Sequence, residues 1–223
     1  MSADEKGAAG RVLAGRCHAE SEAELESFYG KDLPRLREGL EQLNDLAEGF
    51  ACTEGNSDDL KPVVYYTSRI KSPESLVDKV RRKGGDGSSL AAAIDAGVQD
   101  ILGLRIICAF GDDVYAAVRW VESQPEVEVL RTKDYIKNPK PNGYRSYHMN
   151  VRFTSGAAAF LPSCEIQIRT VATDFWATLE HKMKYKKSVK NQALLTQELK
   201  RCADEIASVD LDMQTLRDAI RRA

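Results

Sequence analysis

The stretch CEIQIRTVATDFWATLEHK, residues 164–182, indicates the fold class because two periodicities meet in it. Its first residues alternate polar and apolar side chains, the pattern of a half-buried β-strand. Glu165, Gln167 and Arg169 fall on one face of this strand, and the isoleucines between them fall on the other. The residues that follow, 170–185, form a helical pattern. A strand that leads into a helix indicates a domain that mixes α and β structure.

Similar patterns lie on both sides of this stretch. Runs rich in β-branched and apolar residues predict further strands, and residues that recur at three- and four-residue intervals predict helices. Besides 164–169, the predicted strands are 63–70, 102–110, 127–135 and 147–154, and the predicted helices are 20–50, 73–82, 112–123 and 193–221. Within 20–50, Pro34 lies either in a first turn or between two helices. We therefore expect an α+β fold, a mixed β-sheet of about five strands flanked by helices, with long N- and C-terminal helices.

The chain has 223 residues, enough for one compact domain with helical extensions. Residues 1–19 are small and polar, and we expect them to form a flexible N-terminus. Residues 20–190 are predicted to form the main domain, including the N-terminal helices, and residues 191–223 a C-terminal helix. The apolar stripes of the two end helices pack either within the chain, on the sheet or on each other, or on another copy of the chain, and we expect both.

The composition excludes several classes of protein. Hydrophobic residues make up 43% of the chain, charged residues 30%, and the formal net charge is −2, so no global field attracts nucleic acid. The basic residues gather locally between 61 and 83, which indicates one local anionic ligand. The five cysteines are scattered, which argues against a disulfide framework and a structural zinc site. A polar start and the lack of a membrane-length apolar run predict a cytoplasmic protein with no membrane partner.

A group of basic side chains lies on the strand at 63–70 and the helix after it. Arg69 and Lys71 project from one face of the strand, and Lys79 and Arg82 share a face of the helix. Four cations that converge on one cleft can hold a triphosphate. Taken alone, the segment equally fits a solvated basic helix, which is the more common case.

Two acids and an arginine lie in or beside predicted buried strands. Asp100 precedes a strand, where a carboxylate is a good Mg²⁺ ligand. Arg105 lies inside that strand and can lay its guanidinium on an aromatic base. The alternative is a structural ion pair, either between Asp100 and Arg105 or a similar one. Glu165 also lies in a strand, where a carboxylate is costly without a partner. A metal ion shared with Asp100 would supply one.

The loop between the strands 127–135 and 147–154 is stiffened by two prolines and a glycine. Tyr144 can stack on a base, worth about 1–3 kcal/mol, and Asn142 can read a base edge. Lys133 and Lys140 can hold phosphates, and His148 can serve a phosphate or a hydroxyl. The alternative is an ordinary surface loop with a core histidine. In the helix 170–185, Phe175 and Trp176 are expected to fill the core and Glu180 to lie at the surface.

These segments together resemble the synthetase domain of the RelA/SpoT family, and the whole chain resembles the stand-alone small alarmone synthetases. The ordered set is far more specific than any one motif. The matching motifs are SRIK at 68–71 with K-x-x-RK at 79–83, D-I-x-G-x-R at 100–105, KDYI-x-NPKPNGYRS-x-H at 133–148, EIQIRT at 165–170 and FWATLEHK-x-KYK at 175–186.

The resemblance implies a nucleotidyltransferase-like sheet and transfer of the β,γ-pyrophosphate of ATP to the 3′-hydroxyl of GDP or GTP. On the ATP side, it implies that Arg69 and Arg105 sandwich the adenine and that Lys71, Lys79 and Arg82 hold the phosphates. It assigns Mg²⁺ to Asp100 and Glu165, the latter also as a group that helps deprotonate the hydroxyl. For the acceptor, it implies guanine stacking on Tyr144 with Asn142 nearby, phosphate or ribose contacts from Lys133, Lys140 and His148, and support from Gln167.

The family pattern also implies a homotetramer built through the terminal helices, and leaves pppGpp or RNA open as an effector. The charge of Asp174 lies where some relatives that bind an effector place a neutral amide, so it disfavours a phosphate ligand there. The three histidines, His18, His148 and His181, form no His-Asp pair, so we do not expect alarmone hydrolysis.

Other functions fit parts of the pattern. A nucleotidyltransferase acting on RNA ends would predict a broad basic track and a third metal carboxylate, and neither is evident. A single-stranded RNA-binding module would use Tyr144 and the basic residues, but it leaves Asp100 and Glu165 without a purpose, because acids in a phosphate groove repel RNA. A degenerate synthetase acting as a scaffold is disfavoured because all the expected catalytic residue types are present.

Overall fold

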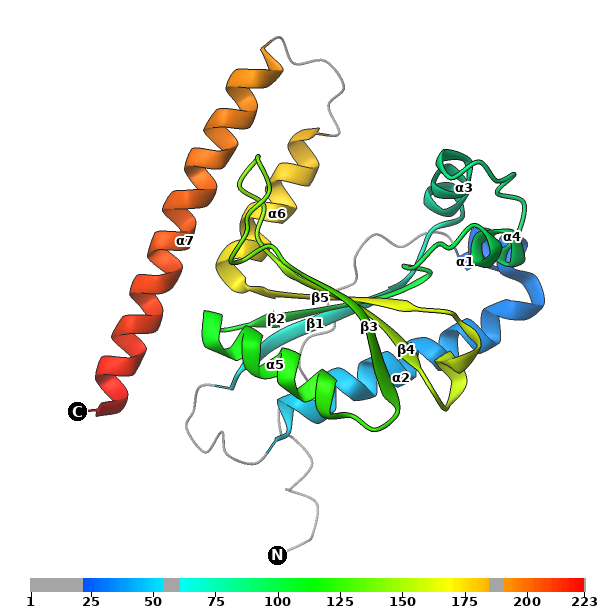
Figure 1. Ribbon diagram of the computed structural model, residues 1–223, viewed down its shortest axis with the longest axis horizontal. Coiled ribbons are helices and arrows are strands. Elements are labelled where there is room, and N and C mark those ends of the chain that lie inside the picture. The colour runs from blue at the N-terminus through cyan, green and yellow to red at the C-terminus, as the bar shows by residue number, and fades with distance from the viewer. Residues whose placement is uncertain (1–21, 54–60, 185–190, 223) are drawn as a thin grey trace, which may run out of the picture.

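The computed structural model describes residues 22–53, 61–184 and 191–222 (Figure 1). The predicted flexible N-terminus, residues 1–19, lies outside these ranges. The strands are β1 Val63–Ile70, β2 Leu102–Cys108, β3 Val127–Asp134, β4 Tyr147–Phe153 and β5 Cys164–Thr170. The helices are α1 Glu22–Tyr29, α2 Leu33–Ala51, α3 Pro73–Arg82, α4 Leu90–Asp95, α5 Gly111–Ser123, α6 Val171–Lys184 and α7 Gln192–Arg222, with 3₁₀ turns η1 Gly30–Asp32 and η2 Ala157–Phe160.

The five strands form one sheet in the order β1-β2-β5-β4-β3. Strands β2 and β5 pair in parallel, and the other neighbours pair antiparallel. A parallel pair needs a crossover connection, and here the chain passes through α5, β3, β4 and η2 between the two strands. The predicted mixed sheet flanked by helices is therefore confirmed.

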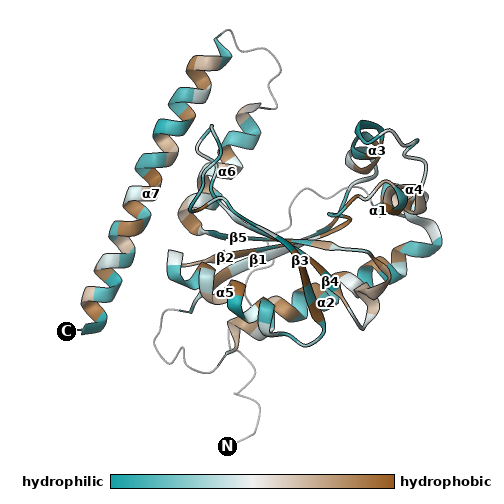
Figure 2. Ribbon diagram, viewed as in Figure 1, coloured by the Kyte–Doolittle hydropathy of each residue, from teal (hydrophilic) through white to brown (hydrophobic). Residues whose placement is uncertain are grey.

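One face of the sheet is covered by α2 and α5 (Figure 1). The apolar side chains of the strands point to this face, among them Leu104, Ile166 and Ile168, which are buried. Leu36 and Leu43 of α2 are fully buried as well. The brown strand segments above α2 in Figure 2 follow this core. The period-two pattern of the sequence thus assigned the faces of β5 correctly.

The opposite face of the sheet carries the polar side chains. It is flanked by α3 and α4 at one end and by α6 at the other, with α7 outside α6 (Figure 1). Helix α7 packs on α6 and touches α5, and much of its surface is exposed. The apolar stripe of the N-terminal helix α2 therefore packs on the sheet, whereas the apolar stripe of the C-terminal helix α7 is only partly covered.

Two local features differ from the expected elements. The helical stretch 20–50 is divided at Gly30, whose φ of +47° suits a residue without a side chain. Pro34 lies in the first turn of α2, one of the two places predicted for it. Helix α4 was not predicted, because six residues with three alanines show no amphipathic pattern. A serine is a common residue at the N-cap of a helix, and Ser89 has that role here, since its Oγ accepts a hydrogen bond from the Ala92 amide. Within the described residues, no helix combines the length and apolar character needed to cross a bilayer.

Candidate active site

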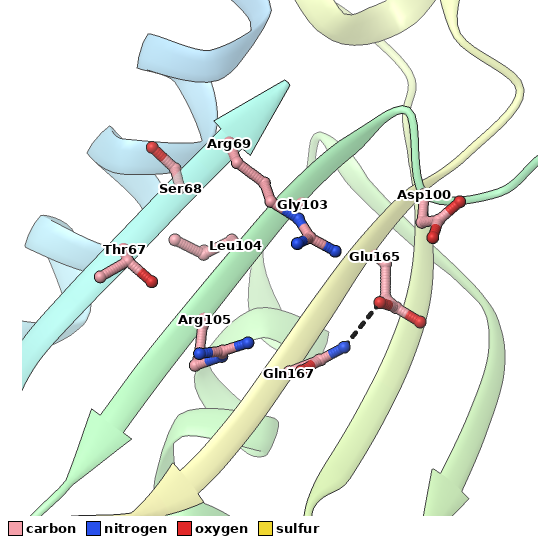
Figure 3. A pocket seen from close by; sticks show the side chains of 9 residues that line it. All are labelled: Thr67, Ser68, Arg69, Asp100, Gly103, Leu104, Arg105, Glu165 and Gln167. Atoms are coloured by element: carbon pink, nitrogen blue, oxygen red, sulfur yellow. Dashed lines mark hydrogen bonds between the residues drawn. The ribbon is translucent and has the colours of Figure 1, made fainter. Parts of the chain in front are cut away.

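An open pocket lies on the polar face of the sheet, over the ends of β1, β2 and β5 (Figure 3). It combines basic side chains and both acids singled out in the sequence. The lining residues are Thr67, Ser68, Arg69, Asp100, Gly103, Leu104, Arg105, Glu165 and Gln167.

The strand register explains why these residues meet. Gly103 pairs with Arg69 on one side and with Glu165 on the other. A second row of paired residues lies two positions along the strands and therefore on the same face. It consists of Thr67, Arg105, Gln167, His148 and Lys133.

Gly103 places no side chain between Arg69 and Glu165, although a Cβ atom there would make only ordinary van der Waals contacts. A Cβ atom on Gly103 would lie 3.8 Å from Arg69 Cγ and 3.9 Å from its Nε. The guanidinium of Arg69 extends past Gly103 toward Glu165 (Figure 3). Together with Arg105, it gives the pocket two planar cations on neighbouring strands, a suitable pair for an aromatic base.

Asp100 lies at the end of the pocket between two lysines. Lys71 Nζ donates to Asp100 Oδ2 at 2.9 Å and Lys79 Nζ to Oδ1 at 2.8 Å. Burial alone would raise the pKa of Asp100, but the hydrogen bonds and charges of the lysines outweigh it and lower the pKa below its ordinary value. The carboxylate is therefore ionised near neutral pH, as a metal ligand must be.

The cations do not all converge as expected. Lys71 and Lys79 meet at Asp100, and Arg69 lines the pocket. Arg82 is exposed, and its Nε donates to the Asp78 carbonyl of its own helix. The structure therefore does not bring Arg82 to the other three cations.

Arg105 does not form the suggested ion pair with Asp100. Its Nη1 lies 3.6 Å from Asp174 Oδ1, while Asp100 is held by the lysines. The two residues therefore do not pair with each other, but each forms another ion pair of the structural kind that the alternative allowed. The guanidinium of Arg105 remains part of the pocket lining.

Glu165 lies between Gln167 and His148. Gln167 Nε2 donates to Glu165 Oε2 at 2.7 Å, and His148 Nδ1 lies 3.6 Å from Oε1. Burial would raise the pKa of Glu165 and the charge of Asp100 adds to this, but His148 and Gln167 lower it on balance. Both acids are thus ionised and line one pocket, although 64 residues separate them in the sequence.

An aromatic cluster lies beside the pocket, on the loop before β4 and on β4 itself. Tyr144 Oη and His148 Nε2 are 2.8 Å apart, and the Tyr135 ring lies 5.2 Å from the His148 ring. Lys140 Nζ lies over both tyrosines, 4.6 Å from the Tyr144 ring centroid and 4.7 Å from that of Tyr135. Such a contact is worth only about 0.5–1 kcal/mol at an exposed site, so the amine can exchange it for a phosphate. Lys133 Nζ lies 6.0 Å from the Tyr135 ring, at the edge of the cluster.

Asn142 braces the loop in this structure. Its Nδ2 donates to Glu180 Oε1 at 2.9 Å, and its Oδ1 accepts from the Tyr144 amide. Glu180 is buried, so its predicted place at the helix surface was wrong. The same helix turn buries Trp176 as expected but leaves Phe175 58% exposed, which corrects the expectation that both fill the core.

The buried ion pair of Arg169 and Asp174 was not predicted to be part of the site. Arg169 Nη1 donates to Asp174 Oδ1 at 2.9 Å, and its Nη2 donates to Tyr144 Oη at 2.7 Å. Tyr65 Oη also donates to Asp174 Oδ2. The alternating pattern of the strand could have indicated the role of Arg169, since it shares a strand face with Glu165 and Gln167. Tyr135 was missed too, although it belongs to the same stiff loop.

Comparison with known proteins agrees with this arrangement. Residues 68–190 match the family described as "Region found in RelA / SpoT proteins". GTP pyrophosphokinase YwaC of Bacillus subtilis is 41% identical over 145 residues, 64% of this chain and 68% of that protein. GTP pyrophosphokinase YjbM of the same organism is 34% identical over 191 residues, 84% of this chain and 87% of that protein.

Two solved structures extend the comparison to the fold. The small alarmone synthetase 1 of B. subtilis, bound to its product pppGpp, superposes with a TM-score of 0.72 at 30% identity, covering 86% of this chain and 96% of that one. The small alarmone synthetase 2 of B. subtilis gives a TM-score of 0.72 at 35% identity, covering 86% and 99%. The chain therefore belongs to the RelA/SpoT family, among its small alarmone synthetases.

Proposed function

We propose that this chain is a (p)ppGpp synthetase, which transfers the β,γ-pyrophosphate of ATP to the 3′-hydroxyl of GDP or GTP and releases AMP. The observation that carries the proposal is the position of Asp100 and Glu165. Both line one pocket, with Arg69 and Arg105 above the strands beside them and the cluster around Tyr144 next to it. The relatives named GTP pyrophosphokinase and the neighbour bound to pppGpp support it.

On the ATP side, Arg69 and Arg105 would hold the adenine between their guanidinium planes. Lys71 and Lys79 would turn from Asp100 to the phosphates, because both ammonium groups lie at the pocket end. Arg82 would have to leave its contact with the Asp78 carbonyl to join them. Its contribution is accordingly the smallest of the three.

On the acceptor side, Tyr144 would stack on the guanine, and Lys133, Lys140 and His148 would contact phosphates or ribose. Asn142 would act mainly through the shape of the loop, because its amide already bonds Glu180 and the Tyr144 amide. Gln167 would hold Glu165 in place through the hydrogen bond between their side chains.

The residues of the pocket fit a magnesium ion. Mg²⁺ prefers oxygen ligands and is commonly bound by one or two carboxylates together with substrate phosphates. Asp100 and Glu165 would be those carboxylates, and both are kept ionised by their neighbours. Bound there, Mg²⁺ would neutralise phosphate charge as the reaction proceeds.

The chain's own residues then position the reacting atoms. The acceptor 3′-oxygen attacks the β-phosphorus of ATP, and the bond from that phosphorus to the oxygen bridging it to the α-phosphorus breaks in line with the attack. AMP leaves with the bridging oxygen, and Glu165 accepts the proton of the hydroxyl. Most of the rate enhancement would come from orientation and charge neutralisation.

We also propose that the protein assembles as a homotetramer in the cytoplasm. Val171, Phe175, Leu179 and Met183 recur every four residues on α6 and are exposed. Helix α7 exposes a second apolar row, formed by Val209, Met213, Leu216 and Ile220. Rows of this kind on neighbouring helices suit contact with other copies of the chain.

The reaction is tested by incubating the protein with ATP, Mg²⁺ and GMP, GDP or GTP in turn and separating the nucleotides by anion exchange. AMP that appears only together with a more highly phosphorylated guanosine nucleotide supports the proposal. Conversion of ATP to ADP, or AMP formation without an acceptor, contradicts it. The same series identifies the preferred acceptor.

A further inference from the structure

The loop that carries Tyr144 rests on helix α7. We call residues 139–146 the acceptor loop. Gly143 has a φ of +88°, and a Cβ atom on it would lie 2.5 Å from Ala203 Cβ and 3.0 Å from Lys200 Cα. Only glycine satisfies both the backbone conformation and this approach. The backbone of the acceptor loop is therefore in direct contact with α7.

Arg145 stabilises the contact between the acceptor loop and α7 by hydrogen bonds. Its Nη2 donates to Asp204 Oδ1 at 2.8 Å, and its Nη1 donates both to the Ala203 carbonyl at 3.3 Å and to the Gly143 carbonyl at 3.0 Å. One planar guanidinium thus joins the loop backbone, the α7 backbone and an α7 carboxylate. The Arg145 side chain is only 16% exposed. It does not belong to the lining of the pocket.

Tyr144 itself packs on the helices behind it. It lies against a small apolar cluster formed by Trp176 and Ala177 of α6 and Leu199 and Ala203 of α7. Trp176 Nε1 donates to the Leu199 carbonyl at 3.0 Å, which joins the two helices at this level. The ring that would stack on guanine therefore has α7 as part of its support.

We propose that Arg145 is a positioning residue that locks the acceptor loop onto α7 and so sets the affinity for the guanosine nucleotide. The inference rests on the proposed function, since it assigns the loop to the acceptor. A loop that is already ordered loses less entropy when the nucleotide binds, so the lock favours acceptor binding. ATP binds to β1, β2 and α3, which Arg145 does not touch, and its affinity should not change.

The chain supplies a matched control at the other end of α7. Arg217 binds Asp112 of α5 through Nη1 at 2.9 Å and Nη2 at 2.6 Å. This clamp also holds α7 against the domain, but it lies far along the helix from the acceptor loop. Asp204→Asn and Asp112→Asn each remove the charge of one carboxylate that binds an α7-docking arginine, with no change in size. A merely structural role of α7 docking would affect both variants alike.

The experiment compares wild type, Arg145→Ala, Asp204→Asn and Asp112→Asn. Binding of GDP and of a non-hydrolysable ATP analogue is measured separately by calorimetry, and amide hydrogen exchange is followed in residues 139–146. We expect Arg145→Ala to weaken GDP binding about tenfold and Asp204→Asn to weaken it several-fold, with faster exchange in the loop. ATP-analogue affinity should stay within about twofold, and Asp112→Asn should leave GDP affinity and loop exchange unchanged.

A charge exchange gives a second test. Arg145→Asp alone places an acid beside Asp204 and should weaken GDP binding strongly, and adding Asp204→Arg should restore part of the loss. The inference is overturned if Arg145→Ala leaves GDP affinity unchanged, if it weakens both nucleotides equally, or if Asp112→Asn weakens GDP binding as much as Asp204→Asn. A wild-type protein that binds GDP through this loop but makes no alarmone would refute the proposed function and leave the inference standing.

Discussion

Lys71 Nζ lies 2.9 Å from Asp100 Oδ2, and both residues are buried at the end of the pocket. Lys79 binds the other oxygen of the same carboxylate. The acid that we assign to the metal ion is thus held by the two ammonium groups that we assign to the ATP phosphates. Phosphates that attract the lysines would free the carboxylate, so ATP and the metal ion should bind together.

The Lys79→Met variant should bind ATP poorly. It keeps an unbranched side chain that is shorter by one atom and removes one cation from the phosphate site, and a charge-assisted hydrogen bond is worth about 1.5–3 kcal/mol. We expect the KM for ATP to rise about 10- to 100-fold, while the KM for GDP stays within about twofold. Steady-state kinetics with each substrate varied in turn measures both values.

Lys83→Met is the matched control for this variant, because Lys83 ends the same helix and its Nζ donates to the Gly97 carbonyl. It should leave both KM values close to wild type. Equal effects of the two substitutions would mean that only the overall charge of the segment matters.

The Glu165→Gln variant should lose transfer but keep the fold. The amide has the same shape as the carboxylate but cannot take a proton from the 3′-hydroxyl or hold a metal ion well. Loss of such a group typically costs about 10²–10⁴ in rate. Alarmone formation should therefore fall at least about 100-fold, with the thermal unfolding midpoint unchanged within a few degrees.

Glu128→Gln is the control for this carboxylate, because Glu128 lies on the exposed part of β3 and pairs with Arg152. Its rate should equal that of wild type. A Glu165→Gln protein that made alarmone at the wild-type rate would refute the assignment of Glu165.

The Asp112–Arg217 clamp predicts a pH dependence of stability. Burial would raise the pKa of Asp112, but the hydrogen bonds and charge of Arg217 outweigh it, so the pKa is lower in the folded state than in the unfolded one. The clamp therefore stabilises the fold above the unfolded pKa of about 3.9, and its contribution is lost as the pH falls through the lower folded pKa.

Urea unfolding of wild type and Asp112→Asn between pH 3 and pH 7 measures this contribution. Because Asp112 is half exposed, the difference should be only about 1 kcal/mol at pH 7. It should shrink toward pH 3. A difference that grows on acidification would show that the charge of Asp112 does not stabilise the fold.

The apolar row of α7 predicts the effect of charge on assembly. Met213→Lys together with Leu216→Lys places two cations in the row, where burial against another copy would desolvate them. Both positions are exposed, so the fold of the single chain should persist. Sedimentation velocity should then report a smaller particle than wild type. Leu130→Lys, at an exposed position on β3, should leave the mass unchanged.

Much of the fold could be predicted from the sequence, because local patterns determine it. The predicted ranges of the strands agree with β1 to β5 to within two residues. The period-two pattern also placed Glu165, Gln167 and Arg169 on one face, the face that carries the pocket. The long-range partners could not be predicted. Nothing local to Asp100 says that Lys71 and Lys79 hold it and that Arg105 turns to Asp174 instead.

The orientation of residues on helix α6 and the role of the loop amide Asn142 could not be predicted from local patterns either. Neighbouring residues on a helix point about 100° apart, so Phe175 and Trp176 could not both face α7, and only Trp176 does. An amide in a stiff loop suits base recognition and loop bracing equally well. Asn142 proved to brace the loop because Glu180 lies beneath it, a fact of packing rather than of spacing.

In the proposed reaction a diphosphate, not a single phosphate, moves from ATP to the guanosine nucleotide. ATP labelled at the β-phosphate tests this directly when it is incubated with the protein, GDP and Mg²⁺. We predict that the label leaves ATP, appears at the 3′ position of the guanosine product, and is matched by an equal amount of unlabelled AMP. Label that remains in ADP, with a guanosine product carrying only one added phosphate, would contradict the account.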